Sequence, residues 1–100
     1  MNQVILVGRL TKELEAKELE NEKKEVIATL AVSRQFKNKD GIYETDFIPC
    51  VLWNGIAQNV NEYCHKGDVI GVRGRLQTNE DGQVVIIAEK VTFLSAKKED

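Results

Sequence analysis

Three aromatic residues and the cations near one of them are the side chains in this sequence with a recognisable binding chemistry. Phe36, Phe47 and Trp53 lie in the middle of the chain, and Lys or Arg stands close to Phe36 in the segment Ser33–Lys39. Flat apolar rings beside cationic groups suit the stacking of nucleic-acid bases. Any one aromatic in a small domain is more often a core residue, which is the alternative for all three. Phe36 favours stacking, because it stands where a strand pattern runs out into a polar turn.

Few other residues suggest a reaction. Cys50 and Cys64 form no CxxC motif and have no further ligand types at metal-binding spacing, so we predict reduced, buried thiols. Cys64 and His65 are neighbours, and neighbouring helical residues point about 100° apart, which disfavours a nucleophile and its base. With one His and no phosphate-binding glycine loop, the sequence predicts neither an enzyme nor a metal or other cofactor.

Length and charge narrow the possible classes of protein. A chain of 100 residues can bury one modest core, so a single domain is expected. The net charge is only −2, so any surface that attracts nucleic acid must be local. No basic segment precedes an apolar run at the N-terminus, and no apolar stretch approaches the roughly 20 residues that span a bilayer. We therefore expect a soluble, cytoplasmic protein.

The first third of the chain reads as strands. Val4–Leu10 is almost continuously apolar, as expected of a strand that is buried on both faces or lies at a subunit contact. Glu13–Glu25 has helix-forming composition. We interpret it as strand, turn and strand, with the turn at Asn21, and keep a helix as the alternative. The β-branched run Val26–Val32 should be a core strand.

The segment from Tyr43 to Trp53 is predicted to be the next strand. Alternation would place Phe47, Val51 and Trp53 on one face, and Ile48, Cys50 and Leu52 on the other. Pro49 removes a ladder hydrogen bond and so indicates a sheet edge or a bulge.

A short helix and a hairpin complete the pattern. Ile56, Val60 and Tyr63/Cys64 recur at helical spacing, with Asn54 as the N-cap and Gly67 as the C-terminal glycine. Strands are expected over 68–77 and 83–94, joined by a turn that contains Asp81-Gly82. Five strands with one helix between the third and fourth predict an all-β OB-fold, a Greek-key barrel, over residues 1–95, with 96–100 as a polar end.

Several blocks of sequence resemble one family. Met1–Lys12 is similar to the opening of bacterial single-stranded DNA-binding proteins, and three further blocks agree in order and spacing. These blocks are Thr29–Arg34 leading into Phe36–Asn38; Thr45–Ile48 with Cys50–Trp53; and Tyr63–Gly67 running into Gly71–Thr78. The resemblance covers nearly the whole chain.

This resemblance implies a set of binding residues. It assigns base stacking to Phe36, Phe47 and Trp53. Basic residues on the same face would contact phosphates, and the candidates are Arg34, Lys37, Lys39, Lys66, Arg73 and Arg75. For Arg73 and Arg75 a solvated face or a subunit contact is an equal alternative. The strand around Gln3–Arg9 resembles a segment used for subunit pairing, so a homo-oligomer is expected, and a tetramer more than a dimer.

The chain also departs from the family pattern. Only Asn79-Glu80-Asp81 stands where the family has a longer hairpin with basic residues and a fourth stacking aromatic. Asn54-Gly55 follows Trp53 where Arg or Lys is usual, and the segment 13–25 is rich in Glu. These changes should weaken phosphate contacts. The chain stops at Lys97–Asp100, which indicates either a truncation or a form without the acidic tail that recruits replication and repair enzymes.

The leading functional hypothesis is sequence-independent binding and protection of single-stranded DNA in replication, recombination or repair, in the bacterial cytoplasm and at the nucleoid. The alternative is an OB-fold adaptor subunit of a replication complex with weak or no DNA binding. A negative surface around the three aromatics would favour the adaptor.

Overall fold

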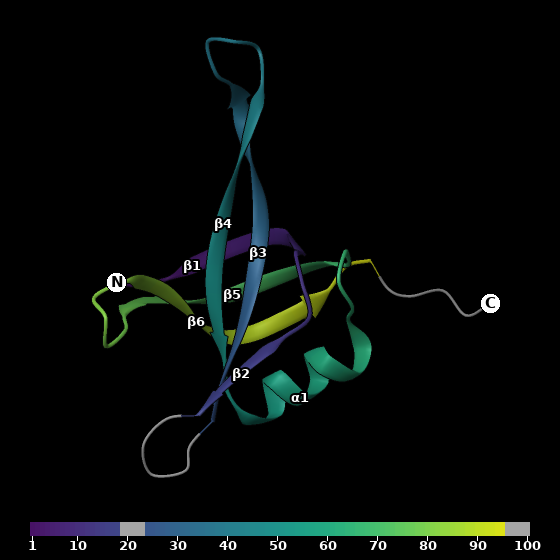
Figure 1. Cartoon of the computed structure of the whole chain (residues 1–100), viewed down its shortest axis with the longest axis vertical. Coiled ribbons are helices and arrows are strands. Elements are labelled where there is room, and N and C mark those ends of the chain that lie inside the picture. The colour runs from purple at the N-terminus through teal and green to yellow at the C-terminus, as the bar shows by residue number, and fades with distance from the viewer. Residues whose placement is uncertain (19–23, 96–100) are drawn as a thin grey trace, which may run out of the picture.

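The computed structural model describes residues 1–18 and 24–95, and its strands form one curved sheet with a helix at one end (Figure 1). The strands are β1 (Val4–Leu10), β2 (Glu15–Glu18), β3 (Lys24–Lys37), β4 (Tyr43–Leu52), β5 (Val69–Thr78) and β6 (Val84–Phe93), and the helix α1 spans Asn54–Tyr63. The predicted turn residue Asn21 and the predicted polar end 96–100 lie outside the described residues. The strand interpretation of the segment before β3 is confirmed for Glu15–Glu18.

Five of the strands close into a barrel. The sheet order is β1-β5-β6-β4-β3, and an additional pairing of β1 with β3 closes the ring. That closure joins Arg9 to Ala31 and Leu10 to Leu30, while β4 and β6 pair in parallel at Cys50–Ile86 and Val51–Ile87. The short β2 adds to β3 outside this ring. The predicted five-stranded OB-fold, with its helix after the third barrel strand, is confirmed.

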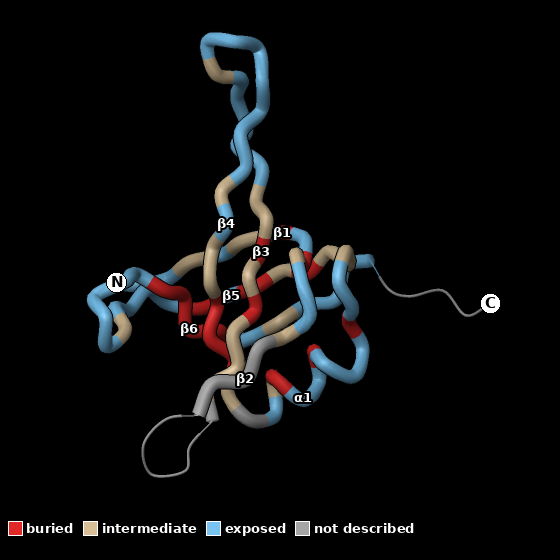
Figure 2. Tube along the Cα trace, viewed as in Figure 1, coloured by how far each residue is buried: buried red, intermediate tan, exposed pale blue. Residues whose placement is uncertain are grey.

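The core fills the barrel and lies against one side of α1 (Figure 2). Leu30, Leu52 and Ile70 are completely buried inside the barrel, and Val60 of α1 packs against the same cluster. The predicted alternation in β4 is confirmed, because Cys50 and Leu52 belong to this core whereas Val51 belongs to a second cluster on the other side of the strand. A second apolar cluster outside the barrel is thus built from the opposite face of the same strands.

The helix begins and ends differently from the prediction. Asn54 is its first residue rather than its N-cap, and the N-cap is Trp53, which makes no capping hydrogen bond through its side chain. Packing explains this, since Trp53 is held against the second cluster and the chain turns there. The helix ends at Tyr63 because Cys64 is extended and buried in the core. Gly67, with φ of 96°, therefore serves the following turn and not the helix.

Pro49 was predicted to lie at a sheet edge or a bulge, and it lies at an open strand edge. It pairs with Thr29 of β3, whereas β4 pairs with β6 only at Cys50 and Val51. The register irregularity between β3 and β4 falls elsewhere, between Ser33 and Lys37. In this region β3 and β4 leave the barrel together as a long two-stranded arm, which is exposed along most of its length (Figure 2).

In the described residues, none of the structure's helical segments has the length and apolar character needed to cross a membrane.

Candidate nucleic-acid interface

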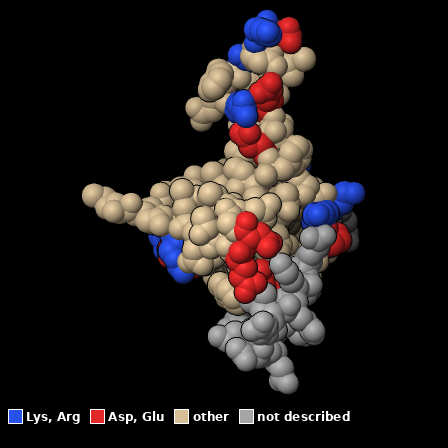
Figure 3. Space-filling view, turned by 60° about the vertical axis from the view of Figure 1, so that its left-hand side comes forward, with Lys and Arg blue, Asp and Glu red and all other residues tan. Residues whose placement is uncertain are grey.

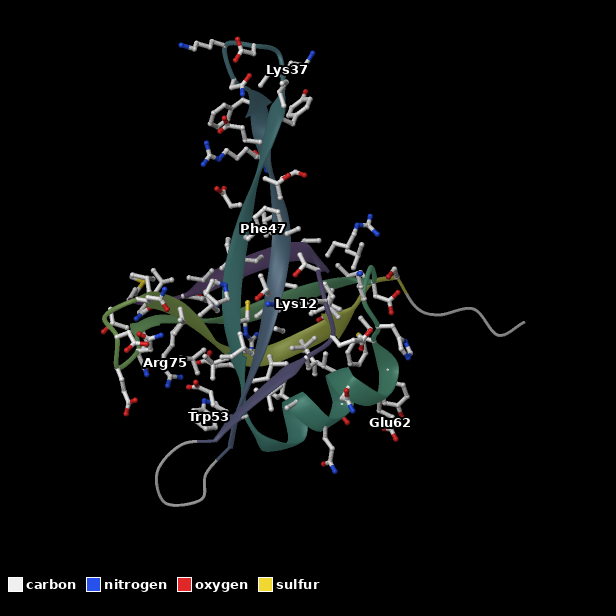
Figure 4. All side chains as sticks on the ribbon, in the orientation of Figure 1. Lys12, Lys37, Phe47, Trp53, Glu62 and Arg75 are labelled. Atoms are coloured by element: carbon white, nitrogen blue, oxygen red, sulfur yellow. The ribbon has the colours of Figure 1, made fainter. Side chains whose placement is uncertain are left out.

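The three predicted stacking aromatics are distributed along the β3–β4 ribbon. Phe36 lies on the arm and is 71% exposed, and Phe47 lies nearer the barrel and is 65% exposed. Trp53 follows the end of β4, six residues beyond Phe47, which corresponds to about 20 Å of extended chain. Figure 4 shows Phe47 and Trp53 at separate levels of the ribbon. The predicted exposure of Phe36 is confirmed, and the two Phe rings are free to receive planar ligands.

Trp53 has a different setting, because it is partly buried. It packs on the second cluster, which consists of the buried Val51, Val85 and Ile87 with Ile27 beside them. It also lines a groove of about 220 Å³ next to the turn between β5 and β6. Three carboxylates line this groove as well: Glu25, Glu80 and Asp81. The Trp53 ring is therefore held in place by packing on one side and borders an open groove on the other.

The tip of the arm places cations beside an aromatic residue that the sequence reasoning did not select. Lys37 stands opposite Tyr43 in the ladder, and its Nζ lies 5.7 Å from the centre of the Tyr43 ring. Lys39 lies in the turn that follows, where Gly41 adopts a φ of 78°. Tyr43 is exposed. The turn residues Asp40-Gly41 indicate a hairpin, from which the pairing of Lys37 with Tyr43 could have been predicted. The irregular register between β3 and β4 made that pairing hard to derive from the sequence.

Arg34 is engaged by acidic side chains of the neighbouring strand. Its Nη1 donates to Glu44 Oε1 at 2.6 Å, and its Nη2 donates to Asp46 Oδ1 at 2.9 Å. A further bond from Nε reaches Asp46 Oδ2 at 3.1 Å. The hydrogen bond from Arg34 lowers the pKa of the Asp46 carboxyl below its ordinary value. Arg34, predicted as a phosphate contact, thus lies on the arm with its guanidinium occupied by carboxylates.

The two arginines of β5 lie on the outside of the barrel in different surroundings. Arg75 pairs with Ile87 in the ladder and so lies next to the second cluster, where its Nη1 contacts Glu89 Oε2 at 3.0 Å. Arg73 stands between Ile5 of β1 and Lys90 of β6. Arg75 is consequently near the Trp53 side of the barrel, as Figure 4 shows, whereas the ladder neighbours of Arg73 are residues of β1 and β6 outside that cluster.

Lys66, another predicted phosphate contact, lies beyond the end of α1 that is opposite to Trp53. It lies in the turn after the helix, and the next residue, Gly67, donates its N–H to the Leu10 carbonyl at 2.8 Å. Trp53 caps the opposite end of that helix, whose ten residues correspond to about 15 Å. The fold therefore does not bring Lys66 together with Trp53.

The distribution of charge is uneven over the visible surface. In Figure 3, acidic side chains gather on the barrel below the arm, while the arm itself carries Lys and Arg mixed with Asp and Glu. The hairpin between β5 and β6 is short, as the sequence predicted, and its turn is closed by hydrogen bonds between Asn79 and Gln83. The β3–β4 hairpin is therefore the long arm of this chain.

The sulfur atoms are remote from this surface. Cys50 and Cys64 are free and buried, as predicted, and burial raises the pKa of the Cys50 thiol to about 12. The described part of the chain contains no group of three or more metal-ligating side chains. The chemistry available along the ribbon is thus stacking, ion pairing and hydrogen bonding.

Comparison with known proteins identifies relatives of this chain. The chain is 42% identical to single-stranded DNA-binding protein 1 of Streptococcus pyogenes serotype M18, with all of the chain and 82% of that protein covered. It is 46% identical to a single-stranded DNA-binding protein of Bacillus cereus, of which it spans 62%. That is less than two thirds of the Bacillus cereus protein's length.

A solved structure has the same fold. It is described as a Plasmodium falciparum SSB complex with ssDNA, and it matches with a TM-score of 0.74 at 24% identity, over 94% of this chain and 95% of the other. The model of the single-strand binding protein family matches residues 1–94. With its barrel, its exposed aromatics and this match over nearly its full length, the chain belongs to the single-strand binding protein family.

Proposed function

We propose that this protein binds single-stranded DNA with little sequence preference, by stacking bases on Phe36, Phe47 and Trp53. The observation that carries the proposal is the exposure of Phe36 and Phe47 on one ribbon of a family member whose relatives are named single-stranded DNA-binding proteins. Apolar rings of this size at the surface cost hydration free energy unless a ligand covers them. Every base offers a π-face, so stacking tolerates any sequence.

The proposed phosphate contacts fall into two groups. Lys37 and Lys39 lie on the arm that carries Phe36, and Arg75 lies on β5 beside the second cluster, on which Trp53 packs. Arg73 and Lys66 lie on other parts of the barrel and would contact DNA only if the strand continues around it. Tyr43 joins the proposed platform through its contact with Lys37. Arg34 is considered separately below because of its ion pairs.

The binding energy proposed for one subunit is modest. Stacking contributes about 1–3 kcal/mol per base, and three or four platforms leave a moderate monomer affinity after the costs of ordering the strand. Several subunits that hold one strand would raise the affinity through effective concentration. The proposal involves no reaction, because DNA is held and released without a covalent step.

We propose that the protein forms a homo-oligomer, a tetramer more readily than a dimer, partly through β1. Ile5 is 70% exposed and Val7 is 55% exposed in the single chain, so the alternative that β1 is buried on both faces within one subunit does not hold. A second subunit would remove these side chains from water. Light scattering on Val7→Glu should give a smaller assembly than the parent chain, and an unchanged mass would contradict this interface.

The proposed setting is the bacterial cytoplasm, at the nucleoid, where single strands arise during replication, recombination and repair. The organisms of the similar proteins support a bacterial origin. Under this proposal, its protein partners are replication or repair enzymes that act on the same single strands.

Fluorescence titration tests the central proposal, since Trp53 is the one tryptophan in the sequence. Oligo-dT should quench its emission at low salt, and mixed-sequence single strands should compete well. Duplex DNA should compete poorly, because its bases are already stacked. Equal competition by duplex, or no quenching at low salt with no binding by anisotropy of a labelled oligonucleotide, would refute the proposal.

A second candidate, an adaptor subunit with weak DNA binding, is favoured by one observation. Glu25, Glu80 and Asp81 line the groove beside Trp53, and carboxylates there repel phosphates. The triple variant Glu25→Gln, Glu80→Gln, Asp81→Asn separates the two functions. If DNA binding is the function, the parent chain binds oligo-dT and the variant binds more tightly. If the adaptor reading holds, the parent chain fails to bind even at low salt.

A further inference from the structure

Four polar side chains form a continuous network across the β3–β4 arm. Asp46 accepts two hydrogen bonds from Arg34 Nε and Nη2, at 3.1 and 2.9 Å. Arg34 Nη1 donates to Glu44 Oε1 at 2.6 Å, and Glu44 Oε2 accepts from Asn38 Nδ2 at 3.1 Å. Asn38 Oδ1 in turn accepts the backbone N–H groups of Asp40 and Ile42 in the turn. We name Asp46, Arg34, Glu44 and Asn38 the arm network.

The network lies where the backbone ladder is irregular. Ser33 pairs with Thr45, but the next pair in the ladder is Lys37 with Tyr43. Three residues of β3, numbers 34–36, therefore face the single residue Glu44 of β4. A bulge of this kind leaves backbone groups unpaired and bends the strand locally. Side-chain bonds that cross from β3 to β4 at this point replace part of the missing ladder.

Phe36 lies inside the irregular segment, and this position links the network to binding. Its ring is exposed and has no ring partner among the described residues, where Tyr63 pairs with Phe93. The packing that fixes Trp53 on the second cluster has no counterpart for Phe36. The direction of the Phe36 ring therefore depends on the shape of the arm backbone around it.

Arg34 is poorly suited to be a phosphate contact in this arrangement. Its guanidinium nitrogens Nε, Nη1 and Nη2 all point to carboxylates, and Arg34, Glu44 and Asp46 together carry a net charge of −1. A phosphate that approached this group would have to displace an existing carboxylate. The planar guanidinium makes a bidentate contact with Asp46 while Nη1 reaches Glu44, and the ammonium of a Lys has no such planar fork.

We propose that Arg34 is a positioning residue, which fixes the irregular arm through Glu44 and Asp46 so that Phe36 is presented to single-stranded DNA. This inference rests on the proposed function. It changes the expected effect of the acidic residues: Glu44 and Asp46 favour DNA binding through the arm's shape, although their charge alone opposes it.

The sign of one variant's effect distinguishes the two roles. Asp46→Asn removes a negative charge from a DNA-binding arm, so charge alone predicts tighter binding. Positioning predicts weaker binding, by about two- to fivefold, the range expected for exposed ion pairs. Arg34→Gln should weaken binding to a similar degree, with the slope of log affinity against log salt unchanged. Arg34→Lys should not restore it, because an ammonium lacks the fork.

Hydrogen exchange without DNA provides the second measurement. In Arg34→Gln and Asp46→Asn, backbone amides over residues 33–45 should exchange faster, while those of β5 and β6 remain as in the parent chain. Glu89→Gln is the matched control, since it breaks the Arg75–Glu89 pair at a comparable exposure outside the arm. It removes the same charge and should leave exchange in the arm unchanged.

Two results would overturn the inference. If Asp46→Asn tightens binding, and Arg34→Gln reduces the magnitude of the salt slope by about 0.7, then Arg34 contacts a phosphate. If amide exchange in the arm is the same in the variants and the parent, the network does not fix the arm. Failure of the parent chain itself to bind oligo-dT would instead refute the proposed function, and this inference with it.

Discussion

Truncation of Trp53 should damage two properties at once, because its ring packs on the second cluster while part of it remains accessible. Trp53→Ala removes the ring from contact with Val51, Val85 and Ile87. Loss of a fully buried Trp costs about 3–5 kcal/mol of unfolding free energy. With part of the ring exposed, we expect about 2 kcal/mol, which lowers the melting temperature of a chain of this length by about 10 °C.

The expected loss of DNA affinity is separate from the loss of stability. Removal of one stacking platform should cost about 1–3 kcal/mol, which corresponds to a weakening of about 5- to 150-fold. A domain with a typical stability of about 5–15 kcal/mol stays folded after a loss of about 2 kcal/mol. Affinity measured well below the melting midpoint therefore reports on the binding surface alone.

Two control variants separate the contributions. Val51→Ala acts on the same cluster from a residue that is 1% exposed, so it should lower stability by about 2 kcal/mol and leave affinity unchanged. Phe47→Ala acts on an exposed ring and should do the opposite. Urea unfolding and anisotropy with labelled oligo-dT give both quantities for each variant. If Trp53→Ala loses stability while the folded protein binds oligo-dT as tightly as the parent, Trp53 is a packing residue and not a stacking platform.

Three further outcomes follow from the structure. The slope of log affinity against log salt should correspond to two to four phosphates per subunit at about −0.7 each, because Arg34 is held by two carboxylates while Lys66 and Arg73 lie on other parts of the barrel. Titrations at several salt concentrations measure this slope, and a much steeper one would contradict the prediction. The pKa of the Cys50 thiol is about 12 in the folded chain, above its ordinary value of 9.0. As pH rises above 9, the thiol therefore ionises in the unfolded chain before it ionises in the folded chain. The free energy of unfolding should consequently fall by up to about 1.4 kcal/mol per pH unit until about pH 12. Urea unfolding at pH 8 and pH 10.5 should therefore show a smaller alkaline loss in Cys50→Ala than in the parent, and equal losses would show that the thiol does not contribute. Gly74→Ala should destabilise the barrel by about 1–3 kcal/mol or more, because the added Cβ would lie 2.0 Å from the Ile87 carbonyl oxygen, and a variant with the parent's urea midpoint would refute this contact.

Local patterns in the sequence were enough to predict most of the fold. The alternation in β4 separated Cys50 and Leu52 from Val51, because a side-chain period of two is a property of any extended strand. Gly41 and Gly82 mark turns, since both adopt positive φ. The exposure of Phe36 also followed from its place beside a polar turn. These features depend on residues close together in the chain.

The ends of the helix could not be predicted in the same way. Asn54 is a better N-cap residue than Trp by local preference, yet Trp53 takes that place because its ring packs on strands β3, β4 and β6. Cys64 ends the helix because its side chain enters the core. In both cases a contact between residues distant in sequence outweighs a preference of about 1 kcal/mol.

The sequence by itself determined which residue types are available to bind DNA, whereas the tertiary structure decided which of them share a surface. Lys66 and Trp53 lie at opposite ends of α1, and Arg34 meets Glu44 and Asp46 across an irregular pair of strands. The charge of a side chain is fixed by its chemistry, but its partners depend on strand register and barrel closure. For that reason the sequence could suggest the aromatic residues as a binding surface, and the occupation of Arg34 by two carboxylates became evident only in the folded chain.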